Sequence, residues 1–357
     1  MKKIYYITAV FATLFLVGCG DGIDLPGVNV ETDLNKIPLP DNNVNLEQVE
    51  LKPSTEPMLH EGLHTEEDFQ RIRDKKAAGE EPWVSAYQLL VESQFSQKTA
   101  DTYPTEWIKR GVSGDENYMN AARGATIAYQ QALRWKIEQD DEYAAKAVEN
   151  LNKWVQTCVG VTGNTNLSLA AGLYGYEFAI AGELLRDYGG WDRADFAAFQ
   201  NWLLKVFYPA NDDFLKRHHD TNALHYWANW CLCNIAAKMA IGIVTDRRDI
   251  YNEGIAHLQT GDTNGRLRRA IYHDYAPDYN FAQWQESGRD QGHTLMCVGL
   301  MGVICQLAWS QGDDFFAYDD NLFLRACEYA ACCNYTNETV PYTTYIWQKQ
   351  SQWGQSD

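Results

Sequence analysis

The chain has 357 residues, of which 45% are hydrophobic, so it can form one large domain or two ordinary ones around a substantial core. Its formal net charge of −18 excludes a nucleic-acid partner held by general electrostatic attraction. A site for an acidic ligand would need locally concentrated positive charge against this background.

The first nineteen residues predict export and a lipid anchor. Lys2 and Lys3 precede an apolar run over residues 4–17, which is too short and wrongly flanked for a stable membrane span. The run leads into Leu-Val-Gly-Cys, which fits a bacterial lipobox in which the Cys19 thiol is acylated and the chain is cut just before it. We expect a lipoprotein signal peptide over 1–19, and a protein anchored in the cell envelope, in the periplasm or at the outer-membrane surface. An ordinary signal peptide with a chance cysteine is the alternative.

Residues 20–57 predict an extended tether, because proline, Asn and Asp recur there and no hydrophobic period runs through them. We place the folded domain at 58–357. The eight cysteines after Cys19 lie in apolar, helix-like runs and lack the spacing of a disulfide framework or a zinc site. We therefore predict buried free thiols and no metal site.

From about residue 65 the pattern becomes helical, with capping Asp or Asn at several starts and Gly or Pro at several ends. The predicted helices are 118–136, 142–159, 167–188, 192–208, 222–244, 289–311 and 320–334. Many are apolar around most of their circumference, as expected for an inner ring packed on both sides. We predict an all-α fold, an (α/α) toroid or incomplete barrel of antiparallel helix pairs, with an extended stretch at 339–347. A helical-repeat solenoid is the alternative, although no fixed repeat is visible.

The segment 216–230 is the first candidate for chemistry. His218, Asn222, His225 and Asn229 are spaced four, three and four apart, so they would share one face of a helix. Core helix faces are normally apolar and two tryptophans flank the stripe, so we interpret it as part of a site, with Asn222 and Tyr226 as candidate ligand contacts. A polar face turned to solvent is the alternative.

The segment 285–294 is the second candidate. Glu286, Arg289 and His293 are spaced three and four apart, and a very apolar helix follows at once. Charges at the mouth of a buried helix are often paired, functional, or both. Glu286 is a candidate ligand contact, and a purely structural ion pair between Glu286 and Arg289 is the alternative.

Two further stretches combine positive charge with aromatic rings. Residues 266–279 hold three arginines, including Arg269, and three tyrosines. We interpret them as a loop over an anionic ligand that presents a phenol as proton donor; a solvated surface loop is the alternative. Trp107 lies near Lys109 and Arg110 and is the best candidate for stacking on a sugar ring.

Three stretches of the sequence carry a family resemblance. They are residues 228–230 leading into 239–242, the Glu-Ser-Gly-Arg-Asp-Gln-Gly-His stretch at 286–293, and residues 308–314. They are similar to the alginate lyase family of (α/α)-toroid polysaccharide lyases, particularly forms from gut and marine Bacteroidetes. The stretch at 286–293 is the most specific. The similarity extends through 171–185 and 328–334 and covers roughly residues 60–345.

This resemblance implies a toroid that acts on uronates by elimination. The family neutralises the substrate carboxylate with an Asn, often helped by a His or Arg, and uses Tyr and His for proton transfer. By position, Asn229 resembles the neutralising residue, and His225 a base or second neutralising group. Arg289 and His293 match the later motif. Tyr279 is our choice for the proton-transferring tyrosine, ahead of Tyr275 and Tyr272.

The chain departs from the family's usual pattern at its end. Related proteins usually continue into a segment with basic and Gly-rich residues, whereas this sequence stops at Asp357. An incomplete toroid or a fragment of a longer chain would explain the difference.

These residue types suit β-elimination. Removing the weakly acidic C5 hydrogen of a uronate builds charge on the neighbouring carboxylate, which amide, guanidinium or imidazolium groups stabilise. A base then takes the proton and an acid protonates the departing oxygen. A nearby Arg or protonated His would lower the pKa of a tyrosine from about 10 and let one phenol serve in both steps. No metal or organic cofactor is required.

The sequence therefore predicts a polysaccharide lyase that cleaves an acidic polyuronate such as alginate or glucuronan. An (α/α) glycoside hydrolase is one alternative, but it needs two carboxylates flanking the bond, and no such pair stands out beside the His and Asn residues. A non-catalytic glycan-binding lipoprotein is the other.

Overall fold

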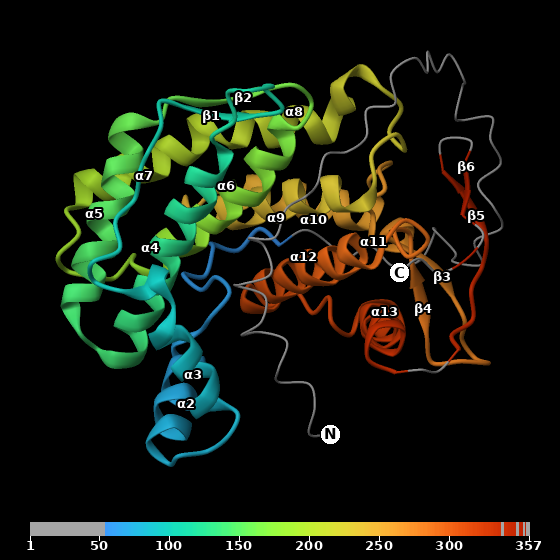
Figure 1. Ribbon diagram of the computed structural model, residues 1–357, viewed down its shortest axis with the longest axis horizontal. Coiled ribbons are helices and arrows are strands. Elements are labelled where there is room, and N and C mark those ends of the chain that lie inside the picture. The colour runs from blue at the N-terminus through green and yellow to red at the C-terminus, as the bar shows by residue number, and fades with distance from the viewer. Residues whose placement is uncertain (1–53, 337–338, 348–349, 353, 355–357) are drawn as a thin grey trace.

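The computed structural model describes residues 54–336, 339–347, 350–352 and 354. Its helices form an inner and an outer layer that alternate along the chain (Figure 1). The inner helices are α4 (Tyr118–Glu138), α6 (Leu167–Leu184), α9 (Ala228–Val244) and α12 (Gln291–Ser310). Each is followed by an outer helix: α5 (Asp141–Thr157), α7 (Arg193–Val206), α10 (Arg248–Thr260) and α13 (Tyr318–Tyr335). The predicted all-α fold of helix pairs is confirmed.

Short helices and two-stranded sheets connect these pairs. The additional helices are α2 (Glu66–Ala77), α3 (Trp83–Glu92), η3 (Gln94–Ser96), α8 (Tyr208–Arg217), η4 (His218–Asp220) and α11 (Leu267–Ala270). Strand β1 (Trp107–Arg110) pairs in parallel with β2 (Gly160–Gly163), and β3 (Ile271–Asp274) pairs antiparallel with β4 (Ala282–Trp284). A hairpin of β5 (Tyr345–Trp347) and β6 (Gln350–Gln352) follows. The stretch predicted to be extended, 339–347, thus ends in a strand.

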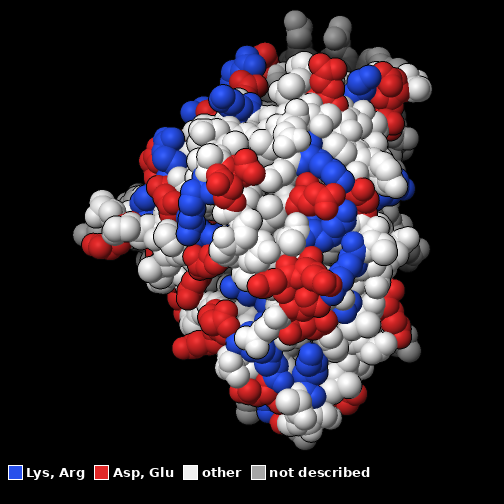
Figure 2. Space-filling model, turned by 90° about the vertical axis from the view of Figure 1, so that its left-hand side faces the viewer, with Lys and Arg blue, Asp and Glu red and all other residues white. Residues whose placement is uncertain are grey.

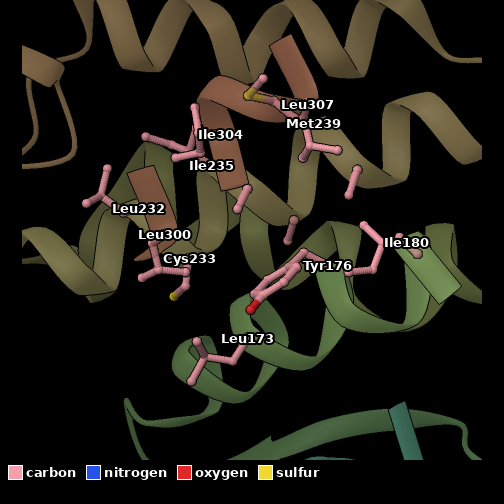
Figure 3. Packing of buried hydrophobic residues seen from close by; sticks show 14 of the residues in the cluster. Leu173, Tyr176, Ile180, Leu232, Cys233, Ile235, Met239, Leu300, Ile304 and Leu307 are labelled. Atoms are coloured by element: carbon pink, nitrogen blue, oxygen red, sulfur yellow. The ribbon is translucent and has the colours of Figure 1, made fainter. Parts of the chain in front are cut away.

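The core lies between successive inner helices, which pack in the order α4, α6, α9 and α12. All residues of α9 are buried, which explains why this helix is apolar on every side. By length and composition α12 could cross a membrane, but here it packs against α9 and α13. Figure 3 shows Tyr176 and Ile180 of α6 on the side of this helix that faces residues of α9 and α12. Gly172 permits close packing, since a Cβ there would lie 2.5 Å from the Cys233 sulfur.

The inner helices run in the same direction, because each outer helix returns the chain before the next inner helix begins. The segments that precede them therefore lie together at one end, which we call the N-terminal end of the inner helices. β1 and its following loop precede α4, and β2 precedes α6. Residues 218–227 precede α9, and β3, β4 and residues 285–290 precede α12.

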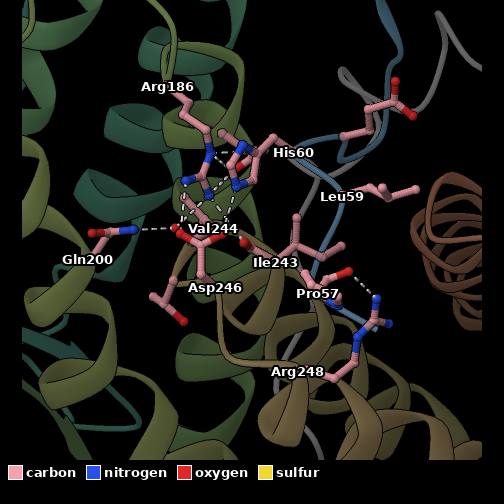
Figure 4. A network of polar contacts seen from close by, with 12 residues as sticks. Pro57, Leu59, His60, Arg186, Gln200, Ile243, Val244, Asp246 and Arg248 are labelled. Carbon is pink, nitrogen blue, oxygen red and sulfur yellow. Dashed lines mark hydrogen bonds and ion pairs between the residues drawn. The ribbon is translucent and has the colours of Figure 1, made fainter. Parts of the chain in front are cut away.

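The first described residues cross the opposite end of the inner helices as a strap, residues 54–64 (Figure 4). Arg248 donates to the carbonyl of Glu56 at 2.7 Å, and His60 lies 2.9 Å from Asp246. Gln311 donates to the carbonyls of Leu59 and Glu61 at 2.9 and 2.8 Å. The predicted boundary at residue 57 is slightly late, because Ser54 already accepts a hydrogen bond from Asn252 at 2.9 Å. The predicted signal peptide, Cys19 and the tether up to residue 53 lie outside the described residues.

Two predicted helix starts are wrong, and local hydrogen bonding explains the first. Residues 222–227 precede α9 instead of belonging to it. The Asn222 side chain accepts a hydrogen bond from the backbone of Leu224 at 2.8 Å, a turn that competes with helix formation. His218 and His219 also have positive φ angles of 50° and 52°. The predicted stripe of four polar residues therefore does not share a helix face. The second helix begins at Gln291, not at residue 289.

The predicted free thiols are confirmed, and most of them are buried as predicted. Cys327 and Cys333 are half-buried, and the buried ones are Cys158, Cys231, Cys233, Cys297, Cys305 and Cys332.

Figure 2 shows the side of the molecule on the left of Figure 1, with acidic and basic side chains intermixed. Helix α5 contributes such pairs: Lys146 lies 3.1 Å from Glu149, and Lys153 lies 2.8 Å from Asp101. Paired surface charges of this kind contribute little stability and leave no field of one sign for a polyanion.

Candidate active site

The start of α9 is capped by side chains from another segment. Its own N-cap residue, Trp227, makes no side-chain cap, so the first amides of the helix need other acceptors. Gln285 accepts from the amide of Ala228 at 3.1 Å, and Glu286 Oε1 accepts from the amide of Asn229 at 2.9 Å. The two candidate segments of the sequence therefore meet at this point.

Glu286 is fully buried, and both of its oxygens are engaged. Oε2 lies 3.0 Å from Nη1 of Arg289, and Oε1 also lies 3.5 Å from the Cys297 sulfur. The Arg289 guanidinium lies 5.2 Å from the centre of the Trp227 ring. The predicted ion pair is therefore present. The prediction that Glu286 contacts ligand directly does not fit its complete burial; it holds Arg289 and the start of α9 in place.

The side chain of Asn229 is the least satisfied polar group here. The residue is 1% exposed, and its Nδ2 has only a weak contact with the sulfur of Met296 at 3.7 Å. Its Oδ1 has no hydrogen-bond partner among the described residues. Buried amides are nearly always satisfied, so this amide is suited to a ligand that supplies the missing contact.

His293 lies on the face of α12 that approaches Asn229. It is one turn before Met296, which contacts the Asn229 amide. Asp290 caps α12 by accepting from the backbone of His293 at 2.7 Å, and its Oδ2 lies 2.6 Å from Nδ1 of the same residue. Burial opposes ionisation of Asp290, but these contacts together hold its pKa below the ordinary value. The carboxylate thus fixes the orientation of the His293 ring.

His225 and Tyr226 lie in the turns before α9. His225 is half-buried and meets the edge of the Tyr226 ring at 4.8 Å. Tyr226 is buried against Phe214 and Trp230, at 5.1 and 4.7 Å, so its ring is a packing element and the predicted ligand contact is not supported. Nearby, burial and then the charges of His219 and His225 lower the pKa of His218 to about 4.

The three candidate tyrosines differ in exposure and in the partners of their hydroxyl groups. Tyr279 is 53% exposed, and its ring contacts that of Tyr275 at 6.5 Å. The Tyr275 hydroxyl donates to Gln283 at 2.6 Å. Tyr272 is 7% exposed, and its hydroxyl has no partner in the described part of the chain.

Tyr272 also lies nearest to the segment that binds α9. Its ring is 4.9 Å from that of Tyr345, whose hydroxyl accepts from the amide of Gly288 at 3.3 Å. Burial raises the pKa of Tyr272 above its ordinary value, so the expected lowering by a nearby cation is not found there. We therefore replace Tyr279 with Tyr272 as the buried phenol of the candidate site.

The remaining predicted ligand contacts, Arg269, Asn222 and Trp107, make contacts of their own. Arg269 donates to the carbonyl of Asp262, and burial followed by the charge of Arg266 lowers its pKa. Asn222 uses its side-chain oxygen in the turn before α9. Trp107 is 42% exposed on β1 and lies over Gly160, where an added Cβ would come within 2.5 Å of the ring.

The β5 strand brings aromatic rings to the site that sequence reasoning did not select. Trp347 stacks on Trp227 at 4.0 Å with an angle of 20° between the rings, while Arg289 also lies over Trp227. The Thr- and Tyr-rich composition of 339–347 predicted an extended stretch, but it did not predict that this stretch packs at the site. Within the described ranges, no group of three or more His, Cys, Asp or Glu side chains could hold a metal ion.

Comparison with known proteins finds a matching family model and solved structures of similar fold. A family model described as alginate lyase matches residues 72–338. A solved alginate lyase A1-III variant, in complex with a tetrasaccharide, has a TM-score of 0.58 at 14% identity, covering 76% of this chain and 78% of that chain. An alginate lyase from Bacteroides ovatus has a TM-score of 0.53 at 13% identity, covering 75% and 81%. Alginate lyase A1-III from Sphingomonas species A1 has a TM-score of 0.52 at 13% identity, covering 78% and 80%. A comparison with curated proteins gives no match.

Proposed function

The chain belongs to the alginate lyase family and is a polysaccharide lyase, and we propose that it cleaves an acidic polyuronate, of the alginate or glucuronan type, at the site around Asn229. One observation carries the proposal. The Nδ2 donor of the buried Asn229 amide has only a weak contact with the Met296 sulfur at 3.7 Å, so it can donate to a substrate carboxylate, and it lies at the helix start that Glu286 joins to Arg289.

Carboxylate neutralisation is the first task of this site. As the C5 proton leaves, negative charge grows on the uronate carboxylate, and fixed donors stabilise it most when they need no reorganisation. Asn229 offers its amide from the first turn of α9, whose N-terminus also favours negative charge. Arg289 adds a guanidinium with further N–H donors, which Glu286 and Trp227 hold in place.

Proton transfer is the second task. Burial raises the pKa of Tyr272, so its phenol is protonated in the free protein and enters the reaction as a proton donor to the departing glycosidic oxygen, not as a base. His293, oriented by Asp290, and His225 are the candidate bases for the C5 proton. Tyr272 could serve in both steps only if the bound substrate and Arg289 stabilised its anion.

The alternative chemistry of glycoside hydrolysis has less support. It needs two carboxylates, one to protonate the leaving group and one to act as base or nucleophile. Glu286 is committed to the amide of Asn229 and to Arg289. Asp290 is committed to the start of α12 and to His293. A binding protein without catalysis would bind a polyuronate but would form no unsaturated product.

The assay that tests this function follows two products at once. The protein is incubated with alginate, glucuronan and a neutral glucan, and absorbance of the unsaturated product and new reducing ends are both measured. We expect both signals to rise together on a polyuronate. Reducing ends without absorbance would indicate a hydrolase, and binding without either signal would indicate a glycan-binding protein.

We also propose that the protein is a lipoprotein anchored through Cys19. The Leu-Val-Gly-Cys sequence at the end of the apolar run supports this proposal. Residues 54–64 lie at the end of the inner helices opposite Asn229. An anchor attached through that end would leave the site facing away from the membrane. Metabolic labelling with a fatty acid tests the proposal: the label is expected on the wild type and should be lost in Cys19→Ala, whereas label on both would contradict it.

A further inference from the structure

Strand β5 packs one of its faces against the proposed site (Figure 1). Tyr345 and Trp347 are two positions apart, so they lie on the same face of the strand, and Ile346 between them is 46% exposed on the other. The Tyr345 ring lies 4.9 Å from that of Tyr272 on β3, and its hydroxyl accepts from the amide of Gly288 at 3.3 Å. This strand therefore joins β3 to the turn before α12.

The segment that leads into β5 is tied to β4. Thr343 donates from its amide to Oε1 of Gln283 at 2.8 Å, and Nε2 of Gln283 donates back to the Thr343 carbonyl at 3.0 Å. Gln283 is fully buried in β4. These two bonds fix the point at which β5 begins, so the position of Trp347, four residues later, is also defined.

The Trp227 ring links Trp347 to Arg289. Trp347 stacks on Trp227 at 4.0 Å with an angle of 20° between the rings, and the Arg289 guanidinium lies 5.2 Å from the centre of the Trp227 ring. Glu286 holds Nη1 of Arg289 at 3.0 Å, while Asp290 lies farther away, 3.7 Å from Nε. An aromatic face adds a second constraint, because it restrains the plane of the guanidinium without using its N–H donors.

The contribution of Trp347 comes from its ring and not from a hydrogen bond. A buried indole N–H usually finds a partner, but Nε1 of Trp347 has none among the described residues. Stacking on Trp227 is therefore the contact that gives this side chain a role at the site.

We propose that Trp347 is a positioning residue for the reaction: it holds the ring of Trp227, which in turn holds Arg289 in the orientation that meets the substrate carboxylate. The inference rests on the proposed function, in which Arg289 helps to stabilise that carboxylate. Trp347 need not touch the substrate itself. A misplacement of about 1 Å can lower a rate about 100-fold, so a ring that acts through a neighbour can still control turnover.

A double-mutant cycle tests this role. The value of kcat/KM on a polyuronate is measured from ultraviolet absorbance for the wild type, Trp347→Ala, Arg289→Lys and the double variant. Arg289→Lys keeps a positive charge beside Glu286 but removes the planar group that lies over Trp227. Trp347→Ala should lower kcat/KM about tenfold to 100-fold in the wild-type background. In the Arg289→Lys background it should cost less than about twofold, because the group that Trp347 positions is already gone. Equal losses in both backgrounds would overturn the proposal.

Two further variants separate positioning from packing. Trp347→Phe keeps a ring that can stack on Trp227, so its kcat/KM should be close to that of the wild type. Trp309→Ala, at a tryptophan of α12 that is 54% exposed, is the matched control and should retain the wild-type value. A lower melting temperature in Trp347→Ala with a wild-type kcat/KM would make Trp347 a packing residue and overturn the proposal.

Failure of the proposed function would look different from failure of this inference. If the wild type forms no unsaturated product from any polyuronate, the proposed function is wrong and the positioning role falls with it. If the wild type forms the product but Trp347→Ala and Arg289→Lys act independently, only the positioning role is wrong.

Discussion

Glu286 accepts a hydrogen bond from the backbone amide of Asn229 at 2.9 Å, although the two residues are 57 positions apart in the chain. This contact ties the segment before α12 to the first turn of α9. It satisfies an amide that α9 cannot satisfy itself, and it fixes the carboxylate that holds Arg289. The same hydrogen bond thus stabilises the start of α9 and positions the proposed catalytic groups.

Replacement of Glu286 should therefore affect stability and activity together. Glu286→Gln keeps an acceptor for the Asn229 amide but leaves Arg289 without its buried counter-charge. We expect a loss of about 2–4 kcal/mol in the free energy of unfolding, measured in urea, because breaking a buried ion pair from one side is strongly destabilising. Glu149→Gln on the surface is the control and should change stability by less than about 0.5 kcal/mol. A loss no greater than that of the control would show that the ion pair is dispensable.

Replacement of tyrosine by phenylalanine should have different effects on the rate at Tyr272 and at Tyr279. Tyr272→Phe should lower the rate of product formation by about 100-fold or more, the usual contribution of a general acid or base. Its melting temperature should not fall, since the lost hydroxyl has no partner among the described residues. Tyr279→Phe, at an exposed position, should leave the rate unchanged. Full activity in Tyr272→Phe would exclude it as the proton-transferring residue.

One buried and two half-buried histidines should make the protein sensitive to acid. Burial lowers the pKa of His64, His218 and His257 to about 4. As pH falls below about 6.5, the unfolded chain binds protons that the folded protein excludes until about pH 4. Stability is therefore present above pH 6.5 and is lost progressively between these values.

The measurement is urea unfolding at pH 7 and pH 5. We expect a lower free energy of unfolding at pH 5, and a smaller difference between the two pH values in His218→Leu. His60→Gln, at an exposed position on the strap, should retain the wild-type difference. An identical pH dependence in His218→Leu and the wild type would refute the role of this buried imidazole.

Gln311 should control attachment of the strap. Its side chain accepts from the amide of Leu59 at 2.8 Å and donates to two strap carbonyls. Gln311→Leu removes all three bonds, so residues 54–64 should become susceptible to limited proteolysis at a concentration that leaves the wild type intact. Gln88→Leu, at an exposed glutamine of α3, is the control. Equal protection of both variants and the wild type would mean that other contacts suffice.

Much of the helical architecture follows from the sequence, because it depends on local patterns. The apolar circumference of α9 and α12 predicted inner helices. Asp192, at the start of the predicted helix 192–208, is one of the expected capping residues, and it accepts from the amide of Ala194 at 2.7 Å. The pairing of Glu286 with Arg289 was also visible as spacing, although these residues lie in a turn and not on a helix.

The remaining features depend on contacts that spacing does not encode. Three polar residues before α9 were assigned to its face, but the side-chain turn at Asn222 delays the helix to Ala228. The choice between Tyr279 and Tyr272 depended on burial, which the antiparallel pairing of β3 with β4 determines. The stacking of Trp347 on Trp227 arises only when distant segments pack.

The most direct measurement compares the initial rate of ultraviolet absorbance on a polyuronate for the wild type, Asn229→Ala and Asn234→Ala. Asn234 lies on the same helix but is already bonded to the carbonyl of Trp230 at 2.8 Å, so its loss tests folding without touching the proposed chemistry. We predict that Asn229→Ala loses about 100-fold or more of the rate while its melting temperature stays within a few degrees of the wild type. A wild-type rate in Asn229→Ala would contradict the account, because the substrate carboxylate would then be neutralised elsewhere.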